Sequence, residues 1–400
     1  MSAPHDAFYM ARAIQLAKRG RYTTDPNPRV GCVLVRDGEI IGEGWHAKAG
    51  LGHAEVEALK NVRDAHGATA YVTLEPCSHH GKTPPCCDAL ITAGISRVVA
   101  AMQDPNPLVA GRGLEKLSAA GIEVACGVLQ DEAAALNRGF IKRMTENRPF
   151  VRSKLAMSLD GRTAMASGES KWITSAEARA DVHRLRAESS AILTGIATVL
   201  ADDPALNARV DFDVAQPLRV VLDSGLNTPP AARMATLPGR SLILTCSGDD
   251  HKQQALQAAG FEVYQLAGKN GRLDLPGVMR FLATQQINEV LVEAGAVLNG
   301  ALLAENLIDE LIVYMAPCVL GDQGRGLFHL PGITAMADKK MLKLLDVRQV
   351  GGDLRLTLKP REEHSVQFKE CLSQFKTDEL SLEEITAEVE AVRQTRYYEQ

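Results

Sequence analysis

Residues 52–87 read GHAEVEALKNVRDAHGATAYVTLEPCSHHGKTPPCC, and this stretch predicts the architecture of the first part of the chain. HAEVEALKNV predicts a helix, ATAYVTL is a β-rich apolar run, and Pro84 and Pro85 suit the start of a helix that continues as CCDALITAG. A short buried strand between two helices is typical of a layered α/β sheet. We therefore expect Cys77 to end the strand and Cys86 to open the next helix.

The same stretch contains one imidazole and two thiols that could bind a metal ion together, namely His53, Cys77 and Cys86. A neutral imidazole and two thiolates can hold Zn²⁺ and leave its fourth position for a water whose pKa the metal lowers. Glu55 is then free to carry a proton from the water to a leaving ammonia, as in zinc-dependent nucleobase deaminases. We expect Glu55 to be the catalytic carboxylate of such a site.

Two plainer interpretations compete with a catalytic zinc site. Ordinary core cysteines and a surface histidine would need no metal. Here, however, His53 is followed by Glu55 and each cysteine directly follows a proline, in the order of the deaminase pattern. A structural zinc ion would need a fourth protein ligand, for which Cys87, His79 and His80 are candidates. Glu55 would then have no role, so we favour the catalytic site.

The spacing of the two cysteines departs from the usual C-x-x-C pattern, because eight residues, SHHGKTPP, separate them. EPCSHHGKTPPC, with PNPRVGCVLV and GHAE before it, closely resembles the bifunctional riboflavin-biosynthesis deaminase–reductases of bacteria. KLAMSLDGRTAMASGESKWITS, TGIATVLADDPALNAR and LVEAGAVLNGALL resemble the reductase domain of that family, and the resemblance covers about residues 5–360. It implies an N-terminal cytidine-deaminase-like α/β/α domain and a C-terminal dihydrofolate-reductase-like α/β domain.

With the resemblance, the sequence predicts three parts: a deaminase domain at residues 1–147, a reductase domain at 148–360, and an acidic tail at 361–400. In the first part, VGCVLV and EIIGEGW flank Asp37-Gly38, a strong hairpin signal. SRVVAAM and IEVACGV predict further strands, and DEAAALNRGFIKRMTEN predicts one closing helix before the boundary at Arg148-Pro149.

The second part predicts another α/β domain, with a substantially parallel sheet. Its expected strands begin with FVRSKLAMSLDG and continue with AILTG, LRVVLD, SLILTC, FEVYQL, NEVLVEAG and DELIVYMAP, alternating with helices such as AEARADVHRLRAES. A GxGxxG motif is missing, but EVLVEAG-AVLNGALL runs from strand through glycine to helix. Gly295 would let a phosphate approach the amides at that helix start, and the resemblance identifies this turn as the pyrophosphate loop.

The resemblance implies two successive reactions. Zinc-dependent hydrolysis would deaminate 2,5-diamino-6-(5-phosphoribosylamino)pyrimidin-4-one, and NADPH would then reduce the ribosyl unit to a ribityl chain, giving 5-amino-6-(5-phosphoribitylamino)uracil. In the first site, His79, His80 and Lys82 are candidates for the substrate phosphate and Asn27 for the ribose. We expect both halves to be active, since neither lacks an expected core element.

Site residues of the reductase follow from the resemblance motif by motif. Those expected to bind substrate are Ser170, Arg186, Leu206, Arg209 and Glu293. Those expected to contact the nicotinamide cofactor are Ala156, Trp172, Thr198, Asp202 and Gly295. Lys154 and Asp202 are both candidates for proton delivery. Without the resemblance, Arg186 and Arg209 would be surface cations and Trp172 a core aromatic residue.

Composition and charge narrow the remaining possibilities. The formal net charge is −5 with no dense basic stripe, which argues against a nucleic-acid partner and against the runner-up function, a tRNA adenosine deaminase fused to an unrelated domain. Neither a membrane span nor a signal peptide is expected, so we expect a cytoplasmic protein whose eight cysteines are metal ligands or free thiols.

A zinc-stabilised binding module without catalysis is a further alternative, which Glu55 disfavours. The family works as oligomers through its reductase domains.

The tail differs from the rest of the chain. Residues 361–400 contain five Lys/Arg and ten Asp/Glu, whereas the remaining residues contain 39 of each sign. Ser381 and Glu384 form a possible capping box, and Ile385, Val389 and Val392 would make a narrow apolar stripe on one helix. A solvated appendage and a docking helix both remain open.

Overall fold

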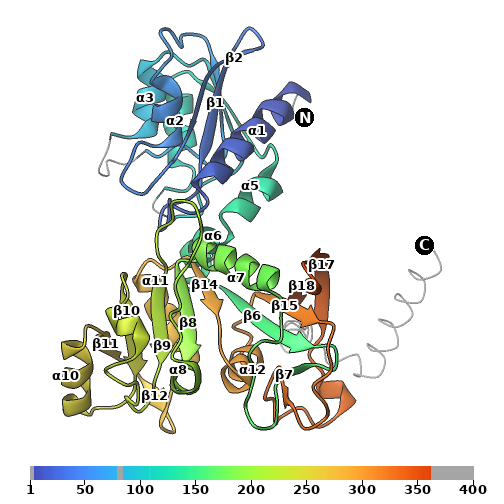
Figure 1. Ribbon diagram of the computed structural model, residues 1–400. Coiled ribbons are helices and arrows are strands. Elements are labelled where there is room, and N and C mark those ends of the chain that lie inside the picture. Colours follow the sequence, from blue (N-terminus) through green and yellow to red (C-terminus); the bar gives the residue numbers. More distant parts are fainter. Residues whose placement is uncertain (1–3, 79–83, 108, 362–400) are drawn as a thin grey trace, which may run out of the picture. The chain divides into compact units, whose positions relative to one another are not determined.

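A computed structural model describes residues 4–78, 84–107 and 109–361, which build two principal β-sheets (Figure 1). The first sheet has the strand order β2-β1-β3-β4-β5. Its strands are β1 (Gly31–Arg36), β2 (Glu39–Trp45), β3 (Thr69–Val72), β4 (Arg97–Ala100) and β5 (Glu123–Cys126). The predicted hairpin at Asp37-Gly38 is confirmed, and both residues have positive φ, 51° and 82°, as a tight hairpin turn requires.

Helices cover both faces of the first sheet, which confirms the predicted layering. They are α1 (Pro4–Ala17), followed by the short 3₁₀ helix η1 (Lys18–Gly20), then α2 (Ala54–Leu59), α3 (Cys86–Thr92), α4 (Arg112–Ala119) and α5 (Gln130–Leu136). Alternate residues of β1 point to opposite faces. Val33 and Val35 pack with α1 and α5, whereas Cys32 and Leu34 pack with α2, α3 and α4. The helices α2 and α3 thus pack on the same face of this sheet.

Two local predictions for the first sheet need correction. The predicted closing helix is two helices, α5 and α6 (Arg138–Glu146), which Asn137 separates. The Asn137 side chain accepts a hydrogen bond from the Arg29 amide at 2.7 Å and donates one to the Arg29 carbonyl at 2.9 Å, so tertiary contacts override the helical pattern. Cys77 does not end a strand, because β3 stops at Val72, whereas Cys86 opens α3 as expected.

The second sheet has nine strands in the order β11-β10-β9-β8-β14-β6-β15-β18-β17. They are β6 (Phe150–Ser158), β8 (Ala191–Gly195), β9 (Leu218–Leu222), β10 (Ser241–Thr245), β11 (Glu262–Gln265), β14 (Glu289–Val292), β15 (Glu310–Ala316), β17 (Leu342–Val350) and β18 (Asp353–Pro360). The run from β11 to β15 is parallel, as predicted, and β18 and β17 add an antiparallel hairpin at one edge. This hairpin was not expected, since many of its apolar residues are exposed and do not form a buried run.

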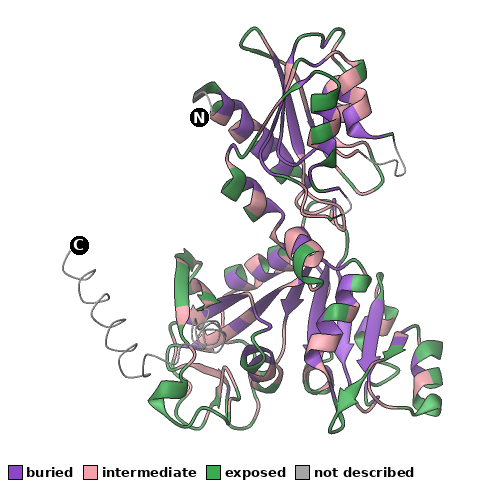
Figure 2. Ribbon diagram, turned by 180° about the vertical axis from the view of Figure 1, so that it is seen from behind, coloured by how far each residue is buried: buried purple, intermediate pink, exposed green. Residues whose placement is uncertain are grey.

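Helices also pack on both faces of the second sheet. They are α7 (Ala176–Glu188), α8 (Ile196–Asp202), α9 (Arg233–Thr236), α10 (Asp250–Ala258), α11 (Leu275–Thr284) and α12 (Ala296–Ala304). Smaller elements are β7 (Arg162–Ala164) paired with β16 (Arg325–Gly326), β12 (Gly268–Lys269) paired with β13 (Arg272–Leu273), and the 3₁₀ helix η2 (Met336–Asp338). The central strands are largely buried (Figure 2), with α11 and α12 on one face and α7 to α10 on the other.

The parallel strands all end on the same side of the second sheet, and ligands of open α/β sheets bind beside these carboxyl ends. The strands β8, β14 and β6 are neighbours, so the residues that follow them lie close together. Among the described residues, no helix combines the length and the apolar character needed to cross a membrane. The predicted tail helix, with Ser381, Glu384 and its apolar stripe, lies outside the described residues.

Candidate active sites

The structure brings His53, Cys77 and Cys86 together, and their donor atoms all lie within 4.8 Å of one another. His53 caps the start of α2 and Cys86 is the first residue of α3, so two helix N-termini converge on the cluster. The His53 Nδ1 atom lies 3.2 Å from the Cys86 Sγ and 3.6 Å from the Cys77 Sγ. One imidazole and two thiols at this separation fit a tetrahedral zinc ion with one position left for water.

The two thiols of the cluster, Cys77 and Cys86, have pKa values shifted in opposite directions. Hydrogen bonding from Cys86, assisted by His53, lowers the pKa of the Cys77 thiol to about 4, although burial acts against this. The Cys86 backbone amide donates a further hydrogen bond to the Cys77 Sγ at 3.3 Å. The pKa of Cys86 is raised because it donates to Cys77 and is buried. One thiolate is therefore ready to bind a cation, and a metal would have to displace the proton of the other.

Glu55 lies in the first turn of α2, two residues after His53, and is only 3% exposed. Burial, with the negative charge of Cys77 beside it, raises the pKa of Glu55 to about 7. A carboxyl group with such a pKa can both accept and return a proton near neutrality. Glu55 is not among the three residues that could hold the metal.

A second imidazole orders the surroundings of the cluster. His46 lies beside His53, with their ring centroids 5.5 Å apart. Its Nδ1 donates to the Gly52 carbonyl at 3.0 Å, and its Nε2 therefore accepts from the Asn27 amide at 3.1 Å. The structure thus holds Asn27, predicted to contact the ribose, near the metal cluster. The predicted phosphate contacts His79, His80 and Lys82 lie outside the described residues.

The contacts of Cys87 do not agree with its being a fourth protein ligand of a structural zinc ion. The Cys87 side chain is buried and donates hydrogen bonds to the carbonyl oxygens of Pro76, at 3.3 Å, and Gly113, at 3.5 Å. It therefore faces α4 and not the cluster of Cys77 and Cys86. His79 and His80, the other two candidates, are not described.

Glu75 organises the loop that follows β4, and the sequence analysis missed this residue. Its carboxylate accepts hydrogen bonds from the backbone amides of Asp104, Gly111, Gly113 and Leu114 at 2.7–3.4 Å. Gly113 is required by this close approach, since a Cβ there would lie 2.1 Å from the Pro76 carbonyl oxygen. A glutamate directly before Pro-Cys was the available signal, but nothing in the sequence identified the amides it would bind.

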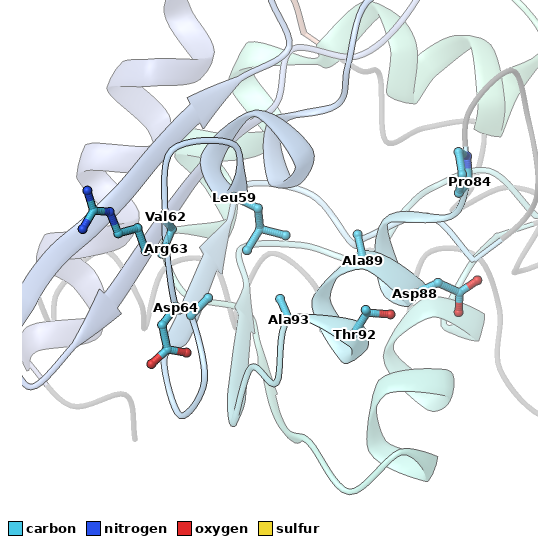
Figure 3. A pocket seen from close by; sticks show the side chains of 10 residues that line it. Leu59, Val62, Arg63, Asp64, Pro84, Asp88, Ala89, Thr92 and Ala93 are labelled. Carbon is cyan, nitrogen blue, oxygen red and sulfur yellow. The ribbon is translucent and has the colours of Figure 1, made fainter.

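One groove in this part of the chain lies apart from the cluster. An open groove of about 570 Å³ lies between the end of α2, the loop after it and α3 (Figure 3). Its lining residues include Leu59, Val62, Asp64, Asp88 and Ala93, and none of the metal-site residues contributes to it. The catalytic interpretation therefore rests on the convergence of side chains at the helix starts and not on this groove.

In the second sheet, an ion pair whose side chains are only 14% and 13% exposed marks the carboxyl end of β14. Arg186 on α7 donates two hydrogen bonds to Glu293, from Nε at 2.5 Å and from Nη2 at 2.8 Å. Burial alone would raise the pKa of Glu293, but Arg186 outweighs it and the pKa is lowered. Lys154 on β6 faces the same carboxylate, and burial lowers its pKa. Arg186 is therefore no surface cation, contrary to the reading of the sequence without the family.

Three of the residues predicted to contact the cofactor follow or lie on neighbouring strands. Thr198 is in α8, which starts directly after β8; Gly295 caps α12 after β14; and Ala156 is on β6. A Cβ at Gly295 would meet nothing within 4 Å, so the space before the α12 amides is open. Buried Asn299, which the sequence analysis missed, donates to the carbonyl oxygens of Ala294 and Gly295 and fixes this turn. The turn therefore fits a phosphate group.

The other predicted cofactor contacts lie on the segment between β7 and α7 and at the end of α8. Asp202 forms an ion pair with Lys171, at 3.0 Å, which joins the two segments. Trp172 is 71% exposed and stacks under Arg179, at 4.4 Å, so it is not a core aromatic residue. Ser170 is half-buried in the same segment. Lys171 connects Trp172 with Asp202, and among the described residues no hydrogen bond or ion pair joins Ser170 to the Arg186–Glu293 pair.

The remaining predicted substrate contacts lie on the loop after α8. Leu206 is buried, whereas Arg209 is exposed and donates to the Asn207 side chain at 3.0 Å. Arg186 donates to the Asn207 carbonyl at 3.1 Å, which places the loop beside the Arg186–Glu293 pair. The structure therefore gathers Lys154, Arg186, Glu293 and this loop at one edge of the sheet.

Comparison with known proteins places both halves. Residues 4–102 match the family described as the cytidine and deoxycytidylate deaminase zinc-binding region, and residues 149–356 match the RibD C-terminal domain. The riboflavin biosynthesis protein RibD of Escherichia coli is 53% identical over 366 residues, which cover 88% of this chain and 99% of that one. The Haemophilus influenzae protein of the same name is 50% identical over 371 residues, covering 89% and 98%.

Solved structures give the same result for the fold. RibD of Acinetobacter baumannii superposes with a TM-score of 0.84 at 49% identity, covering 90% of this chain and 99% of that chain. A diaminohydroxyphosphoribosylaminopyrimidine deaminase/5-amino-6-(5-phosphoribosylamino)uracil reductase of Thermotoga maritima superposes with a TM-score of 0.80 at 37% identity, covering 89% and 99%. The similarity therefore extends over both sheets.

Proposed function

Because this chain belongs to the RibD family of bifunctional deaminases and reductases of riboflavin biosynthesis, we propose that residues 1–147 and 148–360 act in succession on one pyrimidine ribotide. The chain is accordingly both a hydrolase and an oxidoreductase. The observation that carries the first activity is the cluster of His53, Cys77 and Cys86 with buried Glu55 beside it. The runner-up function, a tRNA deaminase fused to an unrelated domain, does not agree with the RibD match at residues 149–356.

The first reaction is the hydrolytic deamination of 2,5-diamino-6-(5-phosphoribosylamino)pyrimidin-4-one. His53, Cys77 and Cys86 would hold Zn²⁺, which would supply the Lewis acidity that lowers the pKa of the attacking water. Glu55 accepts a proton from the attacking water on its carboxylate. It then returns the proton to the departing amine, which leaves as ammonia and not as an amide ion. Asn27, held by His46, orients the ribose.

The second reaction reduces the ribosyl unit with NADPH and yields 5-amino-6-(5-phosphoribitylamino)uracil. The cofactor supplies the hydride, and the protein aligns the two ligands and donates a proton. We assign substrate binding to Ser170, Arg186, Leu206, Arg209 and Glu293, and cofactor binding to Ala156, Trp172, Thr198, Asp202 and Gly295. The open turn at Gly295 supports the cofactor assignment.

Lys154 is the better candidate for the proton donor of the second reaction. It faces Glu293 and Arg186, and its burial lowers its pKa, which eases the release of a proton. Asp202, the other candidate, is ion-paired with Lys171. Asp202 therefore orders the segment that carries Trp172 and contacts the cofactor.

Arg209→Ala should raise the reductase KM for the aminouracil ribotide by roughly 10–100-fold, since a hydrogen bond to a charged group contributes about 1.5–3 kcal/mol. The Arg209 guanidinium is exposed and can bind phosphate oxygens in a bidentate manner. Steady-state kinetics at 340 nm measures the effect, and ammonia release by the same preparation should be unchanged. Loss of both activities together would indicate a folding defect and contradict the assignment.

We also propose that the enzyme is a homo-oligomer whose contacts lie in the reductase domain. β17 is an edge strand, and edge strands present unpaired backbone groups to other chains. Apolar side chains on the β17–β18 hairpin are 38–53% exposed, namely Leu344, Leu345, Val347 and Leu354. A second copy would cover them by an isologous contact.

Val347→Lys should therefore shift the protein toward the monomer, because it places a charge within the apolar surface that the second copy would cover. Light scattering coupled to size exclusion measures the mass. Ile40→Lys, at a 39% exposed site on β2 of the first sheet, is the matched control and should leave the mass unchanged. A mass for Val347→Lys equal to that of the unaltered oligomer would refute this interface.

The proposed compartment is the cytoplasm, where cysteines usually serve as metal ligands or free thiols, and none of the seven described cysteines is in a disulfide. The function itself is tested with purified protein and the diaminopyrimidine ribotide, with and without NADPH. Ammonia release without NADPH, followed by a loss of 340 nm absorbance on its addition, is expected. Absence of both signals from folded, zinc-loaded protein would refute the proposal.

A further inference from the structure

Helix α7 holds the loop after α8 through two neighbouring side chains. His183 and Arg186 are three residues apart and therefore lie on the same face of the helix. The backbone amide of Arg209 donates to the His183 Nδ1 at 3.3 Å, and Arg186 Nη1 donates to the Asn207 carbonyl at 3.1 Å. The backbone on both sides of Ala208 is thereby fixed to α7.

This loop needs external support because its backbone is unusual. Leu206 has a φ of 44° and Asp203 a φ of 40°, a region that residues other than glycine rarely adopt and that surrounding contacts must maintain. Leu206 is buried at 2% exposure and anchors the start of the loop. Arg209, at its end, is exposed and has its backbone amide fixed by His183 alone among the hydrogen bonds of the described residues.

We propose that His183 is a positioning residue of the reductase: its neutral imidazole holds the Arg209 backbone so that the guanidinium faces the substrate. The proposal rests on the proposed function, in which Arg209 binds the phosphorylated substrate. His183 itself touches neither substrate nor cofactor in this assignment. It would act on substrate affinity and not on hydride transfer.

The charges around His183 keep its ring in the required form. Only an unprotonated Nδ1 can accept a hydrogen bond from an amide, because both nitrogens of an imidazolium are donors. Burial, together with the cations Arg186 on the same helix and Arg209 on the loop, lowers the pKa of His183 to about 4, although Glu293 at the end of β14 acts in the opposite direction. The acceptor is therefore present throughout the neutral pH range.

The test compares His183→Ala with His183→Asn. Alanine removes the acceptor, and the KM for the aminouracil ribotide should rise roughly 5–10-fold, as expected for one lost hydrogen bond, while kcat stays within about two-fold. The Asn side-chain oxygen can occupy the position of Nδ1, so His183→Asn should restore most of the affinity. Arg184→Ala, an exposed neighbour on the same helix, is the matched control with unchanged KM.

Binding of the ribotide by calorimetry without cofactor provides a readout that does not depend on turnover, and it should follow the KM. Ammonia release by each preparation reports on folding. Equal KM values for His183→Ala and His183→Asn, or a fall in kcat at constant KM, would overturn the inference. Arg209→Ala is measured in parallel. If it leaves KM unchanged, the proposed function of Arg209 fails. If Arg209→Ala raises KM but His183→Ala leaves it unchanged, only the role of His183 is refuted.

Discussion

Glu55→Gln is expected to slow ammonia release by roughly 10²–10⁴-fold, the usual contribution of general acid–base catalysis. Glutamine has nearly the same shape but cannot accept the proton of water or return it to the departing amine. The side chain is buried beside the three candidate zinc ligands without being one of them, so zinc should stay bound. Ammonia release measures the loss, and elemental analysis measures the zinc content of the same sample.

Glu57→Gln is the matched control, since Glu57 lies on the same helix, two residues further on. Its carboxylate pairs with Lys60 at 2.7 Å and is not among the groups that could hold the metal, so the substitution should leave deamination near the unaltered rate. The reductase step should proceed normally in both variants when the deaminated ribotide is supplied. A Glu55→Gln enzyme that deaminates at near the unaltered rate would show that another group moves the proton.

Cys86→Ala is expected to remove zinc and abolish deamination while the reductase stays active. The remaining His53 and Cys77 would offer only two protein ligands, and a structural or catalytic zinc ion takes at least three. Binding energy of a metal is also folding energy, so the first sheet should lose stability relative to the zinc-loaded protein. Zinc content per chain and ammonia release are the measurements.

Cys87→Ala distinguishes a ligand from its neighbour in sequence. Cys87 is as buried as Cys86 but donates to the carbonyl oxygens of Pro76 and Gly113. Its loss should cost about 1 kcal/mol of stability, as for other buried hydrogen bonds, and leave zinc and deamination in place. Zinc loss in Cys87→Ala, with retention in Cys86→Ala, would invert the assignment of the ligands.

Local signals were sufficient to predict much of the fold. Asp37-Gly38 specified the hairpin because few residues adopt positive φ at both turn positions. The apolar strands AILTG, LRVVLD and SLILTC correspond to β8, β9 and β10, since strands buried on both faces read as continuous apolar runs. The β17–β18 hairpin was not predicted from the sequence, because its apolar side chains are partly exposed and alternate with charged ones.

The site was predictable where chemistry restricts the residue type. Imidazole and thiol have few substitutes as zinc ligands, so the cluster of His53, Cys77 and Cys86, with Glu55 beside it, could be predicted from the sequence as a candidate site. Residues that act by holding a backbone have no such restriction. Asn137 interrupts a helical pattern, and His183 and Asn299 fix loops, through contacts with segments that only the fold brings near.

Four backbone amides donate hydrogen bonds to Glu75, and these bonds restrict the length of the segment that carries the amides. Surface loops usually tolerate inserted or deleted residues, because their backbone makes few fixed contacts. Here the amides of Asp104, Gly111 and Gly113 converge on one buried carboxylate, so an inserted or deleted residue that displaced any of them would break a hydrogen bond to it. We therefore expect this segment to tolerate changes in its length less well than an ordinary surface loop.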